Sequence, residues 1–326
     1  MRVERLSRRW IVTLDLAAWA ATAFMGSLAL TQAAGYTGLT VVYVLQALTP
    51  FLLTPAVPLA AVACLTRRHA IALTNVAIAA SLLVLCAPVV FHPAPSRPAA
   101  DAPILRIAHS NAYFKNATPN QAAITLMALD VDVLAVTEYD VDVAKALTAL
   151  GVDNRYPFRV DHAPNNRNGV ALFSRYRIIA STVEPIGGQF GVNATIDLDG
   201  TEVRIIVVHP LPGVDRSALA QWHRDLATFA SLATSPGPPT VMVGDFNSSR
   251  WHPAFREMLD DGLIDAHEQL GRGFSRSWPN GSLIPRFVRL DHALLGHGVS
   301  AVSIRDLKVP GSDHLGFVVE VAITAR

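Results

Sequence analysis

The sequence predicts an α/β domain that follows a helical membrane region. Two observations lead to this fold class. The hydrophobic fraction of 51% is high for a wholly soluble enzyme, and it is concentrated early in the chain, where no charged residue stands between Asp15 and Arg67. The rest of the chain alternates short apolar runs with amphipathic stretches, as the strands and helices of an α/β domain do. We therefore divide the chain into a membrane region (1–91), a linker (92–103) and an α/β domain (104–326).

The membrane region contains three apolar stretches, at about 10–34, 39–65 and 70–91. Each reaches the roughly 20 residues with which a helix crosses a bilayer core, so we expect a bundle of three transmembrane helices. Two alternatives remain open. The first stretch could be a cleaved signal peptide, although it exceeds the ~7–15 apolar residues typical of one. Three prolines (Pro50, Pro55 and Pro58) would kink or break the second stretch, which makes a re-entrant hairpin the alternative there.

Arginines indicate how the membrane region is oriented. Arg2, Arg5, Arg8 and Arg9 precede the first stretch, and Arg67 and Arg68 separate the second from the third. Basic flanks stay on the cytoplasmic side. With three spans, both groups of arginines lie there and the α/β domain lies outside the cytoplasm. We therefore expect a multi-pass protein of the cell membrane, and a re-entrant second stretch would reverse this orientation.

The linker and the α/β domain differ from the membrane region in composition. The linker carries four prolines and predicts a semi-rigid, non-helical spacer. Beyond residue 91 the chain has 21 basic and 24 acidic residues, so it lacks the overall basic charge usual for nucleic-acid-binding proteins. Both cysteines, Cys64 and Cys86, lie in the membrane region, which excludes a thiol nucleophile or a cysteine-ligated metal in the domain.

The domain alternates predicted strands with helices. Thr118 is a suitable N-cap, with Pro119 at the first helical position, and Asp199-Gly200 between two strands indicates a hairpin. We expect strands at 104–111, 131–136, 170–173, 191–198, 202–208, 238–243, 289–295 and 317–323, and helices at 118–129, 217–233 and 253–259.

Polar residues stand where several of these strands end. They are Asn111, Glu138, His209, Asp245 and Asp313. Polar groups at one edge of a buried sheet lie where a cleft can form, so we expect them to share a site. The centre of this set is Gly244-Asp245-Phe246-Asn247, which places a carboxylate and a carboxamide directly after a buried strand.

An ordered set of motifs resembles the endonuclease/exonuclease/phosphatase superfamily over about residues 104–324. With the membrane region, the chain looks most like the bacterial membrane-anchored branch that includes VanJ-type proteins. The resemblance implies a four-layer α/β sandwich, in which two packed mixed β-sheets are flanked by helices. The motifs are Ser110-Asn111, Thr137-Glu138, Asn168 to Arg175, Val208-His209-Pro210, Gly244 to Asn247, Arg289 to His292 and Gly311 to His314.

The resemblance also implies roles for single residues. Glu138, Asn111 and Asp313 match metal-site positions, and their hard oxygen ligands suit Mg²⁺, with Mn²⁺ as the alternative. Asn168 and Asn111 match phosphate contacts, and Arg289 is a candidate cation for further phosphate charge. Thr137 stands where many relatives carry glutamine.

Five further positions match the catalytic set. Asp245 and Asn247 would position the attacking water, and His209 would protonate the leaving oxygen. Asp291 would orient His314. Asp313 and His314 complete the set. Either Asp245 or His314 could take the proton of the water. We expect His292, next to Asp291, to point to the opposite strand face and to be structural.

These features predict a membrane-anchored, metal-dependent hydrolase of phosphoric ester or anhydride bonds. A domain tethered beside the outer leaflet meets lipid headgroups at high effective concentration. Our first hypothesis is therefore a lipid-linked phosphate or diphosphate substrate, such as a polyprenyl diphosphate. We expect the lipid bilayer as a partner, favour no nucleic acid and infer no obligate protein partner. The alternatives are a membrane-tethered nuclease or other phosphodiesterase, and a non-catalytic membrane scaffold.

Overall fold

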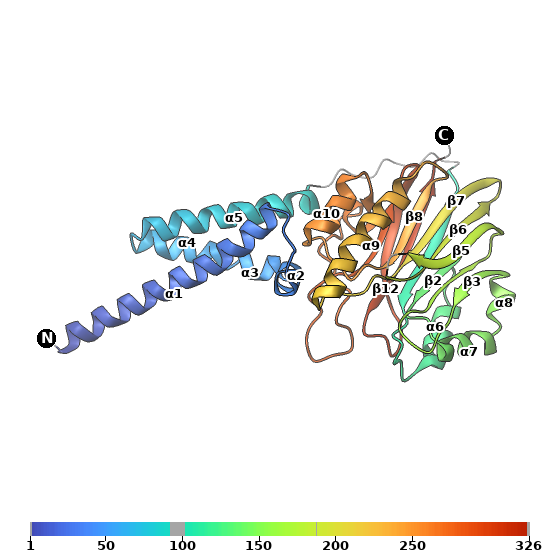
Figure 1. The fold of residues 1–326 in the computed structure, drawn as a ribbon, viewed down its shortest axis with the longest axis horizontal. Helices are drawn as coiled ribbons and strands as arrows, with labels where there is room; N and C mark the ends of the chain where they lie inside the picture. Colours follow the sequence, from blue (N-terminus) through green and yellow to red (C-terminus); the bar gives the residue numbers. More distant parts are fainter. Residues whose placement is uncertain (1, 92–101, 187, 325–326) are drawn as a thin grey trace. The chain divides into compact units, whose positions relative to one another are not determined.

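The computed structural model describes residues 2–91, 102–186 and 188–324 (Figure 1). It divides into two compact units, which are described separately. The helical unit comprises Met1–Pro88 with Trp251–Pro253, and the α/β unit comprises Val89–Arg250 with Ala254–Arg326. The predicted linker falls mostly on residues 92–101, which lie outside the described residues.

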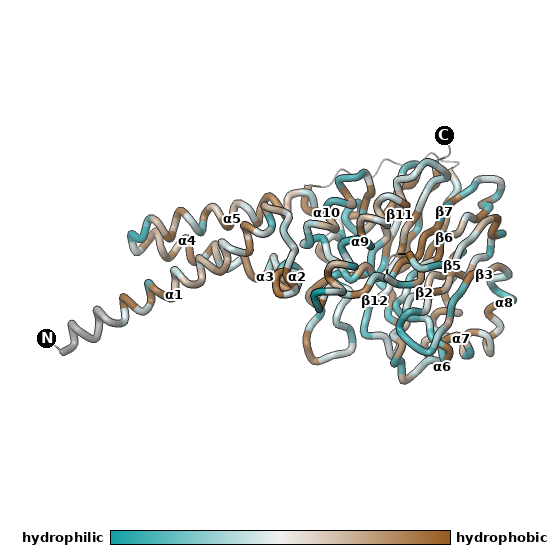
Figure 2. The backbone as a smooth tube through the Cα atoms, in the orientation of Figure 1, coloured by the Kyte–Doolittle hydropathy of each residue, from teal (hydrophilic) through white to brown (hydrophobic). Residues whose placement is uncertain are grey.

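The helical unit provides two clear candidate membrane spans. Its helices are α1 (Arg2–Ala33), α2 (Thr40–Ala47), α3 (Thr49–Leu53), α4 (Ala56–Leu65) and α5 (His69–Val90). Trp10–Ala33 and His69–Val90 are long and apolar enough to cross a membrane, which indicates membrane association. Figure 2 shows a hydrophilic turn between the more hydrophobic α4 and α5.

The predicted second span differs from expectation. Thr40–Ala47 and Thr49–Leu65 are bent by 79° relative to each other, so they form one broken span or a re-entrant segment. Pro50 explains the break, because a proline removes a helical hydrogen bond and clashes with the preceding turn. Pro55 stands at the junction of α3 and α4, and Pro58 lies in the first turn of α4. Among the described residues, the unit therefore has two candidate spans, or three if the bent pair counts as one.

Polar contacts show the direction of the bent segment within the helical unit. Gln32, near the end of α1, donates from Nε2 to Thr49 Oγ1 at 2.7 Å. Asp15, near the start of the apolar part of α1, pairs with Arg68, which follows α4. Thr49–Leu65 thus returns the chain from the far end of α1 towards its beginning. A helical segment of this length covers about 25 Å.

The α/β unit consists of two packed six-stranded mixed sheets flanked by helices (Figure 1). The first sheet has the order β11-β12-β1-β2-β4-β3, and the second has the order β5-β6-β7-β8-β10-β9. The strands are β1 (Ile104–Asn111), β2 (Val133–Thr137), β3 (Phe158–His162), β4 (Val170–Ser174), β5 (Ile178–Ile186), β6 (Gln189–Leu198), β7 (Thr201–Val208), β8 (Thr240–Asp245), β9 (Ile264–Asp265), β10 (Asp291–Leu295), β11 (Val299–Lys308) and β12 (Leu315–Ile323). The helices are α6 (Pro119–Met127), α7 (Val141–Ala149), α8 (Val152–Arg155), α9 (Arg216–Thr234), α10 (Pro253–Asp260) and α11 (Ala266–Gln269).

Alternating apolar side chains build the core between the two sheets. Leu105, Ile107 and Leu172 of the first sheet and Val207 and Val243 of the second belong to one buried cluster. A second cluster joins the outer face of the first sheet to α6 and α7. On the second sheet, α9 buries Trp222, Leu226 and Phe229. This arrangement has the helix–sheet–sheet–helix layering that the resemblance implies.

Each sheet contains one parallel pair of strands, and this pairing brings the motif residues together. β1 runs parallel to β2, with Asn111 opposite Thr137. β7 runs parallel to β8, with Val208 opposite Gly244. The antiparallel strands β12 and β10 start at the edge where these four strands end.

Local details confirm part of the predicted chain path. Asp199 and Gly200 adopt positive φ angles of 51° and 92° between β6 and β7, as a tight hairpin requires. Thr118 stands at the N-cap of α6, but its side chain makes no capping bond. Its hydroxyl instead donates to Asn116 Oδ1 at 3.1 Å.

Candidate active site

Asp245 lies at the centre of the cluster of polar side chains. It ends β8 opposite Asp291, the first residue of β10. Its Oδ1 accepts a hydrogen bond from the backbone N–H of Asn247 at 2.9 Å, and its Oδ2 accepts one from Asn111 Nδ2 at 3.0 Å. Only 1% of Asp245 is exposed. The carboxylate is therefore fixed by donors from two strand ends.

Backbone requirements explain the glycine and the asparagine of the Gly244–Asn247 motif. A Cβ on Gly244 would lie 2.0 Å from the carbonyl oxygen of Val208, so only glycine allows β7 and β8 to approach here. Asn247 adopts a φ of 45°, a conformation that asparagine tolerates. Its Nδ2 donates to Pro210 O at 2.9 Å, which ties the motif to the segment after His209.

Glu138 faces Asp245 from the end of β2. Its Oε2 accepts from the backbone N–H of Phe114 at 2.9 Å, and its Oε1 accepts from Asn111 Nδ2 at 3.3 Å. His209 lies between the two acids, with Nε2 at 3.7 Å from Glu138 Oε1 and from Asp245 Oδ2. These four residues come from the ends of β1, β2, β7 and β8, as the strand-end pattern predicts.

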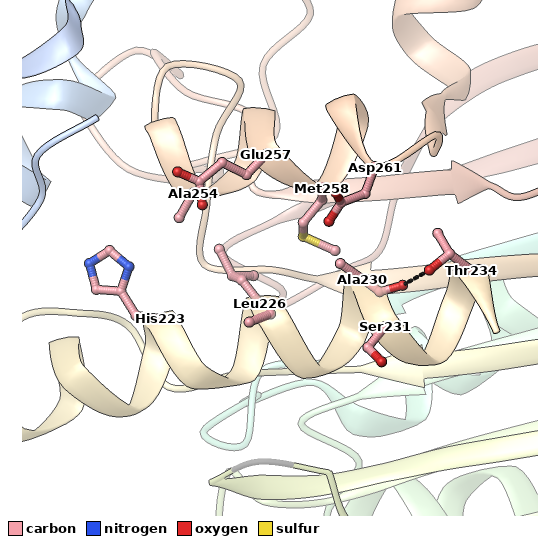
Figure 3. A pocket seen from close by; sticks show the side chains of 10 residues that line it. His223, Leu226, Ala230, Ser231, Thr234, Ala254, Glu257, Met258 and Asp261 are labelled. Carbon is pink, nitrogen blue, oxygen red and sulfur yellow. Dashed lines mark hydrogen bonds between the residues drawn. The ribbon is translucent and has the colours of Figure 1, made fainter. Parts of the chain in front are cut away.

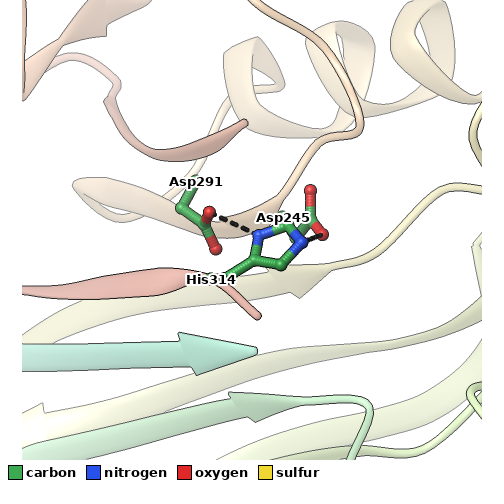
Figure 4. A group of neighbouring side chains, drawn as sticks. All are labelled: Asp245, Asp291 and His314. Carbon is green, nitrogen blue, oxygen red and sulfur yellow. Dashed lines mark hydrogen bonds and ion pairs between the residues drawn. The ribbon is translucent and has the colours of Figure 1, made fainter. Parts of the chain in front are cut away.

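Asp291 and His314 form a buried pair on the other side of Asp245. His314 Nδ1 lies 2.8 Å from Asp291 Oδ2, and His314 Nε2 lies 3.6 Å from Asp245 Oδ2. Figure 4 shows the imidazole between the two carboxylates. Burial lowers the pKa of His314, but Asp291 and Asp245 outweigh it and raise the pKa to about 10. Burial raises the pKa of Asp291, and His314 outweighs it and brings the pKa down to about 2.

His109 also belongs to the cluster, although it stands in none of the sequence motifs. It is fully buried, and its Nδ1 lies 3.6 Å from Asp291 Oδ1. Its Nε2 lies 3.2 Å from Thr137 Oγ1. Strand alternation could have identified it, because His109 precedes Asn111 by two residues on one face of β1.

The donor set fits a hard divalent cation. Glu138 and Asp245 share the donor Asn111 Nδ2, and burial raises the pKa of Asp313, with His314 opposing this rise and Glu138 and Asp245 adding to it. Asp313 Oδ1 is buried and has no hydrogen-bond partner among the described residues. Asp245, Asp291 and His314 also have ligand atoms within 4.8 Å of one another. An excess of buried carboxylate oxygens is the environment that Mg²⁺ or Mn²⁺ would neutralise.

The two predicted substrate contacts, Arg289 and Asn168, are not part of the side-chain contacts described above. Arg289 donates to Ser275 Oγ at 2.7 Å, to Asp306 Oδ1 at 3.1 Å and to the carbonyl oxygen of Asp291 at 3.3 Å, so its guanidinium is committed to structural partners. Its role as a phosphate contact stays a prediction that these bonds do not support. Asn168 precedes Gly169, whose carbonyl accepts from Tyr139 N at 3.1 Å, which places it beside the Glu138 segment.

A separate pocket of about 360 Å³ lies between α9 and α10 (Figure 3). His223, Leu226, Glu257 and Met258 are among the residues that line it. It shares no residue with the cluster around Asp245. The chemistry of the motif residues therefore belongs to the strand ends and not to this pocket.

Comparisons with known proteins agree with this geometry. Among solved structures, TDP2 of D. rerio complexed with a single-strand DNA product aligns with a TM-score of 0.57 and 17% identity, covering 67% of this chain and 98% of that one. The 3′ phosphatase NExo from Neisseria, bound to a product DNA hairpin, gives a TM-score of 0.53 and 21% identity, with coverages of 66% and 98%. An endonuclease/exonuclease/phosphatase protein from Beutenbergia cavernae gives 0.54 and 16%, with coverages of 68% and 72%.

At these identities the structural similarity shows the fold alone. A comparison with curated protein sequences found no match. The family model described as Endonuclease/Exonuclease/phosphatase family matches residues 108–314, a range that contains every residue of the cluster. The chain therefore belongs to the endonuclease/exonuclease/phosphatase family and is a metal-dependent hydrolase of phosphoester bonds.

Proposed function

We propose that this protein is a membrane-anchored, Mg²⁺-dependent phosphohydrolase of lipid-linked phosphates or diphosphates, such as a polyprenyl diphosphate. One observation supports the substrate class above all. The same chain carries the phosphoester-hydrolysing cluster and two or three helices of membrane-spanning length and composition. A tether of this kind raises the effective concentration of lipid headgroups at the cluster.

Glu138, Asn111 and Asp313 are the residues that would hold the metal. When bound, a divalent cation would neutralise charge on the phosphoryl oxygens and orient them for in-line attack. The bond from Phe114 N holds the Glu138 carboxylate in place, and the bond from Asn111 Nδ2 links it to Asp245. The protein thus sets the ligand geometry in advance.

Asp245 is our candidate for positioning the attacking water. Its carboxylate is held by Asn111 and by the Asn247 backbone, so it is oriented before substrate binds. His314, charged and held by Asp291, donates towards developing negative charge on the phosphoryl group. His209 lies between Glu138 and Asp245, where it can protonate a leaving oxygen.

Two exposed cations near Glu138 suit a substrate with more than one phosphate. The Nζ atom of Lys115 lies 5.1 Å from the centre of the Phe114 ring, and the Cζ atom of Arg167 lies 5.4 Å from it. The backbone of Phe114 itself bonds to Glu138. Lys115 and Arg167 therefore stand where they could neutralise a second phosphate, with Asn168 beside them.

The orientation with the α/β unit outside the cytoplasm is part of the proposal. The pairing of Asp15 with Arg68 supports it, because it brings the turn after α4 to the end of the helical unit where the apolar part of α1 begins. A reporter enzyme fused to the C-terminus tests it. Activity of a periplasm-dependent reporter is expected, whereas activity of a cytoplasm-dependent reporter would reverse the orientation.

A set of parallel assays tests the substrate. Full-length protein in proteoliposomes is given polyprenyl diphosphate, sphingomyelin or plasmid DNA, with Mg²⁺ or with EDTA. We expect phosphate release from the polyprenyl diphosphate with Mg²⁺ and none with EDTA. Nicking of DNA without phosphate release from lipid would establish the nuclease alternative instead.

Two aspartate variants test whether the cluster carries the activity. Asp245→Asn is expected to reduce turnover by about 10³-fold, since it removes a positioned charge from the reaction site. Asp199→Asn is the matched control, because Asp199 is exposed in a turn at positive φ and asparagine tolerates that conformation. Equal activity of Asp245→Asn and the wild type would favour a scaffold over an enzyme.

A further inference from the structure

The loop formed by residues 279–287 contains two apolar side chains that are exposed to an unusual extent. Leu283 is fully exposed, at 104% of its reference area, and Ile284 is 61% exposed. Between residues 102 and 324, no other large hydrophobic side chain among those described exceeds 59%. Two adjacent apolar side chains that project into water indicate a contact surface.

The base of this loop is rigid and is bonded to the catalytic motif. Trp278 and Val288 form an antiparallel bridge, and Phe287 N donates to Trp278 O at 3.0 Å. Asn280 N donates to Asp313 O at 2.7 Å, and Asn280 Nδ2 donates to the carbonyl oxygen of Ser312 at 3.0 Å. The loop therefore projects from a fixed position next to Asp313.

Two arginines accompany the loop, Arg286 within it and Arg276 just before its base. Arg286 Nη1 donates to Asn280 Oδ1 at 3.2 Å, and Arg276 Nη1 contacts the Arg286 carbonyl oxygen at 3.4 Å. Both arginines and Ile284 line a depression of about 490 Å³. An apolar tip with guanidinium groups behind it is the arrangement that suits a bilayer interface, where the tip enters the acyl region and the cations meet headgroup phosphates.

We propose that loop 279–287 docks on the lipid surface and guides the phosphate end of a lipid-linked substrate to the side of the cluster that carries Asp313. Leu283 and Ile284 enter the lipid layer, and Arg276 and Arg286 contact phosphate groups there. A lipid surface is the occupant that the chain itself favours, since its apolar helices associate it with a membrane. This inference rests on the proposed function and specifies how its substrate is recognised.

Fluorescence at the loop tip tests the docking without requiring activity. An environment-sensitive dye is attached at Leu283→Cys in full-length protein carrying Cys64→Ala and Cys86→Ala, reconstituted in vesicles of phosphatidylethanolamine and phosphatidylglycerol. Leu150→Cys is the matched control, because Leu150 is an exposed apolar residue at the C-terminal end of α7. We expect a blue shift and protection from iodide quenching at position 283 only.

Two results of this measurement would overturn the docking. One is equal quenching at both positions. The other is a blue shift that depends on protein density and not on lipid, which would assign the loop to contact with a second copy of the chain. Docking without hydrolysis of any lipid would instead refute the proposed function and leave the membrane contact established.

Kinetics then test the guiding role. The double variant Leu283→Ser, Ile284→Ser is expected to raise KM for the lipid-linked substrate by about tenfold, because it removes apolar area equivalent to several methylene groups from the lipid contact. The value of kcat is expected to stay within about twofold. The matched control, Leu150→Ser with Ile179→Ser, is expected to keep both constants. A fall in kcat at unchanged KM would show that the loop shapes the cluster and would overturn the guiding role.

Discussion

The α/β unit contains two buried groups of one aspartate and two histidines, and the comparison between them explains what makes one of them reactive. In the first, Asp291 lies 2.8 Å from His314 and 3.6 Å from His109. In the second, Asp265 lies 2.5 Å from His292 and 3.6 Å from His267. Asp291 and His292 are neighbours on β10 and serve opposite faces of that strand, as the alternation of strand side chains requires. The rings of His109 and His267 both contact Phe317.

The two groups differ in what lies beyond the closer histidine. His314 Nε2 faces Asp245, and through it the carboxylates of the strand ends. His292 Nε2 faces the carbonyl oxygen of Ser248 at 3.1 Å, and its ring packs against Phe255 and Phe246. Both ring nitrogens of His292 therefore face oxygen acceptors and leave none for a substrate. Residue type and distances within each group are alike, so the surroundings decide between catalysis and stability.

Replacing the two aspartates is expected to separate these roles most strongly. Asp291→Asn removes the charge that holds His314, and turnover should fall by about 10³-fold. Asp265→Asn should instead cost about 1–3 kcal/mol of folding free energy, because it replaces a carboxylate that is hydrogen-bonded to His292 in a buried site. Turnover per folded molecule should then stay near that of the wild type. Denaturant unfolding and initial rates measure the two effects.

Loss of activity without loss of stability in both variants would contradict this assignment, because the group around Asp265 would then also contribute to catalysis. Rates are normalised to folded protein, because Asp291→Asn is also expected to lower stability. An Asp197→Asn variant, at a partly exposed site on β6, controls for the loss of one negative charge.

His109 and His267, the more distant histidine of each group, are expected to differ in the same way, with a smaller effect on activity. His109→Gln keeps a hydrogen-bonding side chain but removes the imidazole beside Asp291 Oδ1, and activity should fall by about tenfold, in the range of outer-shell substitutions. His267→Gln should leave activity unchanged. The pH profile of kcat should shift in His109→Gln alone, because only this residue shares an aspartate with His314. Identical pH profiles would make His109 a packing residue.

Much of the candidate active site was predictable from sequence, because its residues stand in motifs at strand ends. Asp245, Glu138, His209 and Asn111 each follow or end a short apolar run, and the two parallel strand pairs bring such ends together. The position of His292 on the opposite face also follows from alternation along one strand. Local pattern therefore carries most of the information on the site.

Other features depend on contacts that a single sequence does not display. Alternation along β1 places His109 on the same face as Asn111, but its contact with Asp291 arises only because β1 and β10 lie in different sheets that pack together. The strand β5 (Ile178–Ile186) was missed because most of its side chains are exposed and form no apolar run. Arg289 has the charge of a phosphate ligand, but its tertiary partners Ser275 and Asp306 occupy it.

The smallest of the expected effects is on how the free energy of unfolding changes at acidic pH. Burial raises the pKa of Asp265 and of Asp291, but in each case the neighbouring histidines outweigh burial, so both folded-state values lie below 3.8, with that of Asp291 at about 2. A depressed carboxyl pKa contributes stability that is present above the unfolded-state value and is lost as pH falls through the folded-state value. Unfolding free energy of the wild type should therefore decline below about pH 4. Asp265→Asn and Asp291→Asn should each show a shallower decline, measured by urea unfolding between about pH 2 and pH 5. If both variants kept the full wild-type slope, other carboxylates would control the acid limb, and the two groups would owe their stability to packing and not to their charges.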